Sequence, residues 1–126
     1  MNMSLPKNYE SSPRLDFLKE FNQAFAEGNI HAVLQALSSD VEWHMVGEKL
    51  LQGKEEVRQE LQSNAEFSPD KVKMYSFISH GKNGAANGKL FFPGGEEMEF
   101  CDIYEFSNET GTMLQSIRSY IVSIRA

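Results

Sequence analysis

One aspartate in this sequence lies where an apolar side chain is expected. Asp102 alternates with Met98, Phe100, Tyr104 and Phe106 along a stretch typical of a β-strand, and three glutamates fall on the opposite face. A carboxyl group among large apolar side chains must be protonated, paired or hydrogen-bonded. We therefore expect Asp102 either to hold or protonate an oxygen of a ligand in a pocket, or to make a purely structural hydrogen bond.

His44 is a second residue that could act on a ligand. It lies in a short strand pattern beside Trp43 and on the face opposite Val41 and Met45. Histidine titrates near neutral pH, so inside a pocket His44 could serve as a general base or acid. The alternatives are a core histidine bonded to a backbone carbonyl and a histidine that faces solvent.

Arg118 is a third candidate, in the last strand pattern. If the preceding turn sets the register, Asp102 lies near Ser116, and Arg118 is a diagonal neighbour that could hold the carboxylate ionised. A shift of one residue would turn Arg118 to solvent. Both arrangements are consistent with the sequence.

Other kinds of site find little support. The three histidines are scattered, and the single cysteine, Cys101, can form no internal disulfide and gives no metal-ligand spacing. The glycine clusters at 81–84 and 94–95 are typical of hairpin turns, because no helix follows them directly. We expect no metal and no cofactor.

Length and charge narrow the class of protein. The chain of 126 residues carries a formal net charge of −6 and no run of lysine and arginine, which argues against nucleic-acid and membrane-surface partners. Residues 1–12 are polar and are expected to be a flexible segment, followed by a single domain over 13–126. We expect a soluble, cytoplasmic protein.

Three helices and five strands would position these residues. Ser12, Pro13 and Gly28 mark the two ends of the first helix. The remaining periodicities predict helices over about 30–37 and 54–65, and strands over about 41–46, 72–79, 85–92, 97–106 and 112–124. Long strands separated by hairpin-length turns imply an antiparallel meander, hence an α+β fold around an apolar pocket.

Several short strings match a known family. They are FAEGN at 25–29, SDVEW at 39–43, Gly53 at the start of the third helix, DIYEF at 102–106 and IRSY at 117–120. Over about Arg14 to Ile124 the chain resembles the nuclear transport factor 2-like superfamily, in particular its SnoaL-like and ketosteroid-isomerase-like members. The resemblance implies a cone-shaped (cystatin-like) curved antiparallel sheet wrapped around N-terminal helices, a ligand cavity and a homodimer formed through the sheet.

The resemblance also suggests roles for single residues. Ketosteroid isomerases use a carboxylate base on the first strand, and they hold the substrate oxygen with a tyrosine of the first helix and a protonated aspartic acid. Here Asp102 matches that aspartic acid, His44 stands at the base, Phe21 stands near the tyrosine, and Tyr120 matches an aromatic residue at the cavity floor. The predicted catalytic residues are therefore His44 and Asp102. The predicted ligand-binding residues are Phe21, Trp43, Phe100, Tyr104, Arg118 and Tyr120.

Three functions fit these features. The first is an isomerase, cyclase or dehydratase in which His44 moves a proton and Asp102 orients an oxygen of a small apolar or carbonyl-containing molecule. The second is a non-catalytic domain that binds a small apolar ligand, and the third is a dimerisation module with a residual pocket.

Overall fold

A computed structural model describes residues 1–64, 68–108 and 112–124 of the chain. The elements, in chain order, are β1 (Asn2–Ser4), α1 (Pro13–Glu27), α2 (Ile30–Gln35), β2 (Leu37–Met45), β3 (Lys49–Gln52), α3 (Gly53–Ser63), β4 (Lys71–His80), β5 (Asn83–Phe91), β6 (Glu97–Phe106) and β7 (Leu114–Ile124). The fold is α+β with a curved, unclosed sheet, which confirms the predicted class.

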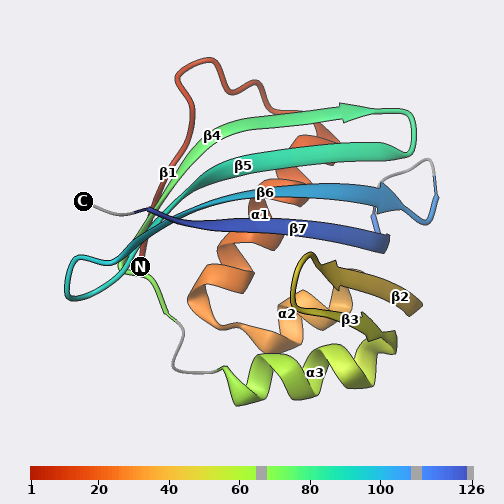
Figure 1. Ribbon diagram of the computed structural model, residues 1–126. Coiled ribbons are helices and arrows are strands. Elements are labelled where there is room, and N and C mark those ends of the chain that lie inside the picture. Colours follow the sequence, from red (N-terminus) through yellow and green to blue (C-terminus); the bar gives the residue numbers. More distant parts are fainter. Residues whose placement is uncertain (65–67, 109–111, 125–126) are drawn as a thin grey trace.

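A single sheet carries all seven of these strands, in the order β1-β4-β5-β6-β7-β2-β3. Strands β4 to β7 form an antiparallel meander, whereas β1 pairs parallel to β4 and β2 pairs parallel to β7. Figure 1 shows the meander curving over α1, with α2, α3 and the β2–β3 hairpin below it. The sheet therefore has one face covered by helices and one face without them.

Helix α1 begins and ends where its capping residues predict. The Ser12 hydroxyl accepts a hydrogen bond from the Leu15 amide at 3.3 Å, and Pro13 occupies the first turn. Gly28 adopts a left-handed conformation at φ 73°, so the chain can turn at once into α2. Leu18 and Phe21 of this helix are buried against the sheet side of the core.

The N-terminal segment differs from the prediction. The expected flexible stretch contains β1, whose residues Asn2 to Ser4 pair with Lys71 to Lys73 at the edge of the sheet. Tyr9 packs edge-on against Phe77 with ring centroids 5.6 Å apart, and its hydroxyl donates to Asp16. These contacts bind the segment to β4 and α1.

The register between β6 and β7 also differs from the prediction. Gln115 forms a bulge, because Phe106 pairs with Leu114 while Glu105 pairs with Ser116. This extra residue shifts the pairing by one position, so that Ser119 rather than Arg118 lies opposite Asp102, while Ser116 pairs with Glu105. It also reverses the face of every later residue in β7, since side chains alternate along a strand.

Within the described part of the chain, no helix combines the length and apolar character needed to cross a bilayer.

Candidate functional site

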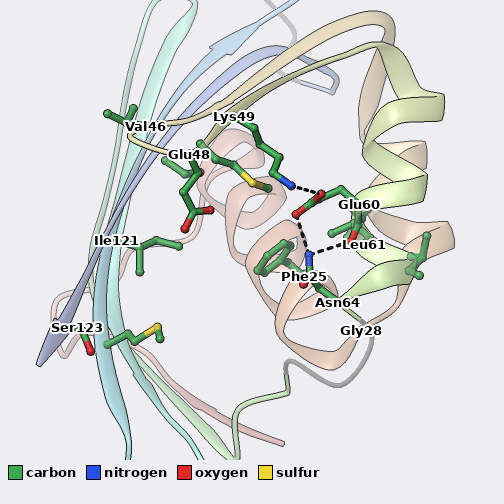
Figure 2. Close-up of a pocket in the computed structure, with 15 residues that line it drawn as sticks. Phe25, Gly28, Val46, Glu48, Lys49, Glu60, Leu61, Asn64, Ile121 and Ser123 are labelled. Carbon is green, nitrogen blue, oxygen red and sulfur yellow. Dashed lines mark hydrogen bonds and ion pairs between the residues drawn. The ribbon is translucent and has the colours of Figure 1, made fainter.

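Two adjoining cavities lie between the helices and the sheet. The outer cavity has a volume of about 590 Å³ and is bounded by α1, α2, α3, the β2–β3 turn and β7 (Figure 2). The inner cavity, of about 70 Å³, lies deeper against the sheet. The two cavities share five lining residues, which are Phe25, Met45, Glu48, Ser119 and Ile121. A ligand in one cavity would therefore contact the wall of the other.

Aromatic side chains form much of the inner cavity. The Trp43 ring lies 6.0 Å from Phe21 and 5.7 Å from Phe25, measured between ring centroids, and Phe100 closes another side. Phe21 and Trp43 are buried, so their rings hold a fixed position. The result is an apolar chamber with few polar groups on its surface.

Asp102 supplies a carboxyl group to this chamber. Its side chain lines the inner cavity and accepts a hydrogen bond from the Tyr104 hydroxyl at 3.2 Å and another from Ser119. Burial raises the pKa of Asp102 from 3.8 to about 6, although the two hydroxyl donors act in the opposite direction. The residue keeps a partly exposed surface because the cavity opens onto it, while protein surrounds the rest.

The two donors to Asp102 are themselves held by other side chains. The Asn22 amide donates to the Tyr104 oxygen at 3.0 Å, and the Trp43 indole N–H donates to the Ser119 oxygen at 2.9 Å. Tyr104 is fully buried, and burial raises its pKa well above the usual value, with the nearby Asp102 charge as the next cause. Tyrosine and serine therefore act as neutral donors that fix the carboxyl group in position.

His44 and Arg118 lie on the other face of the sheet. They pair with each other across β2 and β7, and an Arg118 guanidinium nitrogen approaches His44 Nδ1 at 3.0 Å. Neither residue lines either cavity. Of the alternatives that the sequence left open, the structure has those in which Arg118 and His44 lie away from Asp102, because the alternation in β2 and the bulge in β7 turn both side chains outward.

Tyr120 is also on the outer face, where its hydroxyl accepts a hydrogen bond from Arg118 at 3.3 Å. Its predicted place at the cavity floor is wrong for the same reason. By contrast, the structure brings Phe21, Trp43, Phe100 and Asp102 together around the inner cavity, with Tyr104 behind Asp102. The roles of these residues toward a ligand stay predictions.

Three polar residues of this region were not predicted from the sequence. Asn22 follows Leu18 by four residues and so falls on the buried stripe of α1, a signal that the helical period contains. Ser119 could be placed only with the correct register. Glu48 lies in the β2–β3 turn, and Figure 2 shows its carboxylate pointing into the space between β7 and α1.

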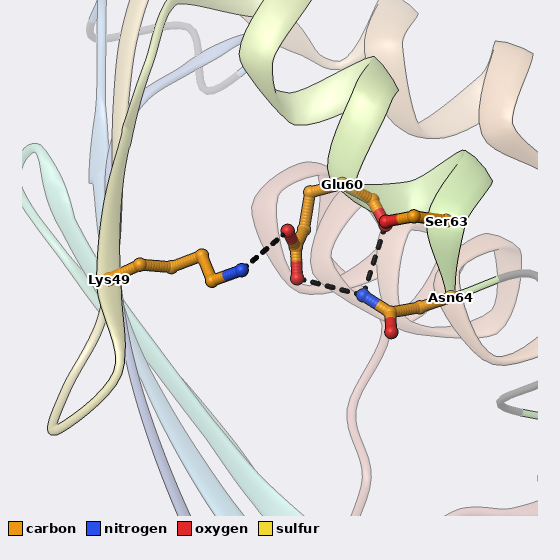
Figure 3. A network of polar contacts seen from close by, with 4 residues as sticks. All are labelled: Lys49, Glu60, Ser63 and Asn64. Atoms are coloured by element: carbon orange, nitrogen blue, oxygen red, sulfur yellow. Dashed lines mark hydrogen bonds and ion pairs between the residues drawn. The ribbon is translucent and has the colours of Figure 1, made fainter.

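The rim of the outer cavity carries a compact polar network. The Lys49 ammonium donates to a Glu60 carboxylate oxygen at 2.9 Å, and the Asn64 amide donates to the other oxygen at 2.7 Å (Figure 3). Ser63 and Asn64 both donate to the Glu60 backbone oxygen as well. This network joins the β2–β3 hairpin to the C-terminal end of α3.

Metal binding has no support in the described ranges, since no group of three or more histidine, cysteine, aspartate and glutamate side chains could hold an ion there. The cavities are lined mainly by carbon, with isolated carboxyl, hydroxyl and amide groups. Such a surface suits an organic molecule with one or two oxygen or nitrogen atoms.

Sequence and structure comparisons place this architecture in a family. A family model described as a SnoaL-like domain matches residues 18–112, so the chain belongs to the SnoaL-like domain family. No curated protein matches the sequence significantly.

Solved structures with the same fold are numerous. An NTF2-like protein of unknown function from Cytophaga hutchinsonii ATCC 33406 is 24% identical, covers 86% of this chain and 99% of its own, and superposes with a TM-score of 0.69. An NTF-2-like protein of unknown function from Burkholderia xenovorans LB400 is 16% identical, with coverages of 91% and 90% and a TM-score of 0.71. A proposed ketosteroid isomerase from Kribbella flavida DSM 17836 is 11% identical, with coverages of 90% and 81% and a TM-score of 0.73. At these identities the likeness establishes the fold alone.

Proposed function

We propose that this protein binds a small apolar molecule that carries a carbonyl or hydroxyl oxygen, and that Asp102 contacts this oxygen. The observation that carries the proposal is a carboxyl group on the wall of an apolar chamber, fixed by two hydroxyl donors and with its pKa raised by burial to about 6. Protonated, Asp102 can donate to a carbonyl; ionised, it can accept from a hydroxyl. Membership of a family that includes small-molecule-binding isomerases and cyclases supports this choice.

The same geometry supports a reaction in which Asp102 acts as a general acid. A proton delivered to a carbonyl oxygen stabilises the enol formed when a neighbouring carbon loses a proton, as isomerisation, cyclisation and dehydration require. His44 cannot be the base of such a reaction from the outer face. The outer-face position of His44 favours the second candidate, a binding domain without catalysis. A measurement of turnover distinguishes the two candidates.

Binding of a matched pair of compounds tests the proposal. 2-Acetylnaphthalene and 2-ethylnaphthalene differ mainly in one carbonyl oxygen, so calorimetric titration at about pH 5 measures what that oxygen adds. We expect the ketone to bind more tightly than the hydrocarbon, and the difference to shrink above about pH 6, where ionised Asp102 has no proton to donate.

Two variants at the site sharpen this test. Asp102→Asn keeps a donor and should retain the preference for the ketone, whereas Asp102→Leu should lose it. Asp40→Asn is the control, because Asp40 is an exposed aspartate that lines neither cavity. Equal preference for the ketone in Asp102→Leu and in the unmodified protein would refute the role of Asp102, and failure of every compound to bind would refute the pocket.

We also propose that two copies associate through the outer face of the sheet. Large apolar side chains are exposed there, among them Ile78 at 61%, Ile103 at 42%, Tyr120 at 41% and Val122 at 60%. Apolar groups gathered on an uncovered sheet face favour association. The free thiol of Cys101 lies on the same face and is consistent with a reducing compartment such as the cytoplasm.

A further inference from the structure

We infer that Glu48 is a second anchor for the ligand, and that the pocket takes an elongated molecule with an amine or another strong hydrogen-bond donor at the end opposite its oxygen. This inference rests on the proposed binding function, since it names the class of molecule that the same pocket selects. It depends on the sizes of the two cavities and on the charges at the rim.

The volumes of the two cavities imply a ligand with a small head in the inner cavity and a larger body in the outer cavity. A single water molecule needs roughly 10–15 Å³ of cavity volume. A cavity of about 70 Å³ therefore holds only about five non-hydrogen atoms. The head that reaches Asp102 must therefore be small. The outer cavity is about 590 Å³, which is enough for the remainder of a drug-sized molecule.

Glu48 is the charged residue that contacts both parts of the pocket. It is one of the five residues shared by the two cavities, and its carboxylate points inward in Figure 2. Within the described residues, no hydrogen bond or ion pair involves this carboxylate, although its backbone amide bonds to Met45. Glu48 is exposed, so water solvates its carboxylate, and a donor group on a ligand in the pocket would replace part of that water.

The neighbouring cation is already engaged. Lys49 pairs with Glu60, whose second oxygen accepts from Asn64, so the three side chains satisfy one another. The rim then carries two carboxylates and one ammonium group, so its net charge is negative. An ammonium group on the ligand is attracted to this arrangement, whereas a carboxylate is repelled.

Three probes with one common body test the inference. They are 2-acetylnaphthalenes that carry an aminoethyl, a hydroxyethyl or a carboxyethyl group at position 6, titrated calorimetrically at about pH 5, where Asp102 keeps the proton that the ketone needs. We expect the aminoethyl probe to bind about fivefold more tightly than the hydroxyethyl probe, as for a partly screened ion pair, and the carboxyethyl probe to bind most weakly. The preference for the amine should weaken as salt is added.

Glu48→Gln should make the aminoethyl and hydroxyethyl probes bind equally, while the affinity for the hydroxyethyl probe is retained. Glu42→Gln is the matched control, because it removes the same charge from an exposed residue that lines neither cavity. Equal affinities of all three probes for the unmodified protein would overturn the inference and leave the proposed function standing. Failure of all three to bind would refute the proposed function itself, and loss of the amine preference in both variants would assign it to overall charge and not to Glu48.

Discussion

The carboxyl group of Asp102 experiences two opposed influences. Removal from water favours its protonated form, while hydrogen bonds from Ser119 and Tyr104 favour the ionised form. Because burial is the larger influence, the pKa is raised to about 6. The group can therefore change its charge near physiological pH, which few aspartates do.

Asp102→Asn should change how the stability of the protein depends on pH. The folded state keeps the Asp102 proton up to about pH 6 and the unfolded state loses it near 3.8, so the unmodified protein loses stability as pH rises through that interval. The asparagine variant lacks this loss. We expect its free energy of unfolding, relative to the unmodified protein, to increase by up to about 2 kcal/mol between about pH 4.5 and about pH 7.5.

Urea unfolding of both proteins at the two pH values measures this difference. Other carboxyl groups contribute equally to both proteins and cancel. A difference in stability that is independent of pH would contradict the raised pKa.

Ser119→Ala should affect two neighbours at once. It removes a donor that lowers the pKa of Asp102, so this pKa should rise further. It also leaves the buried Trp43 indole N–H without its acceptor, which costs about 1–3 kcal/mol of stability. Ser123→Ala is the control, because Ser123 lines only the outer cavity. Equal effects of the two substitutions on stability would refute a stabilising role for the hydrogen bonds that Ser119 makes with Trp43 and Asp102.

At the level of elements, the faces of a regular strand could be predicted from the sequence, whereas those of a strand with a bulge could not. Asp102 was placed on the inner face because β6 alternates without interruption from Glu97 to Glu105. The side on which Arg118 lies stayed open, and Tyr120 was misplaced, because the single extra residue Gln115 reverses the alternation and the hydrophobic pattern around it has no clear signal for a bulge.

The sequence did not indicate the short strands β1 and β3 or the polar beginning of β2, although it predicted the rest of β2. β1 has three residues, and β2 begins at Leu37 with a polar run that is stabilised as strand by tertiary contacts rather than by β-propensity. β3 has four residues and lies next to β2 through a tight turn. Helix ends, by contrast, were predictable from Ser12, Pro13 and Gly28, because each makes a local contact that defines the boundary.

Gly88→Ala tests how the sheet achieves its curvature. A Cβ at this position would lie 2.5 Å from the Lys73 backbone oxygen and 3.2 Å from Phe100, opposite the irregularity between Met74 and Ser76 in β4. Backbone atoms cannot move aside cheaply, so we expect a loss of about 2 kcal/mol or more in the free energy of unfolding. Gly84→Ala is the control in the same strand.

A Cβ on Gly84 would lie 3.1 Å from the end of the Leu18 side chain and 3.3 Å from the Ile78 backbone oxygen, which is less close than the 2.5 Å at Gly88, so its replacement should cost less. Thermal or urea unfolding compares the two variants directly. If Gly88→Ala were as stable as the unmodified protein, the close approach of β4 and β5 would not be required.

At the level of the whole molecule, the proposed homodimer makes a separate prediction. Val122→Lys places a charge on the exposed outer face of β7, where a partner copy would have to bury it. We expect sedimentation velocity to show dimers of the 14.3 kDa chain for the unmodified protein and monomers for the variant. Gln35→Lys, on an exposed position of α2, is the control and should stay dimeric; a monomeric unmodified protein would refute the dimer.

The bulge in β7 affects a single residue, a whole strand and the pocket together. The bulge at Gln115 determines which residues of β7 face the helices. Aromatic side chains on the wall of the inner cavity keep water away from Asp102, and this loss of solvation raises its pKa. The pocket, and with it any selectivity for a ligand, follows from that register.

The most direct test is a carbon-13 NMR titration of the Asp102 side-chain carboxyl group, assigned by its absence in Asp102→Asn. Because burial raises the pKa of Asp102, we expect a chemical-shift change centred at about pH 6. We also expect a bound ketone to move the midpoint upward, because a carbonyl stabilises the protonated form. A midpoint below about 4, or one that a bound ketone leaves unchanged, would contradict these expectations.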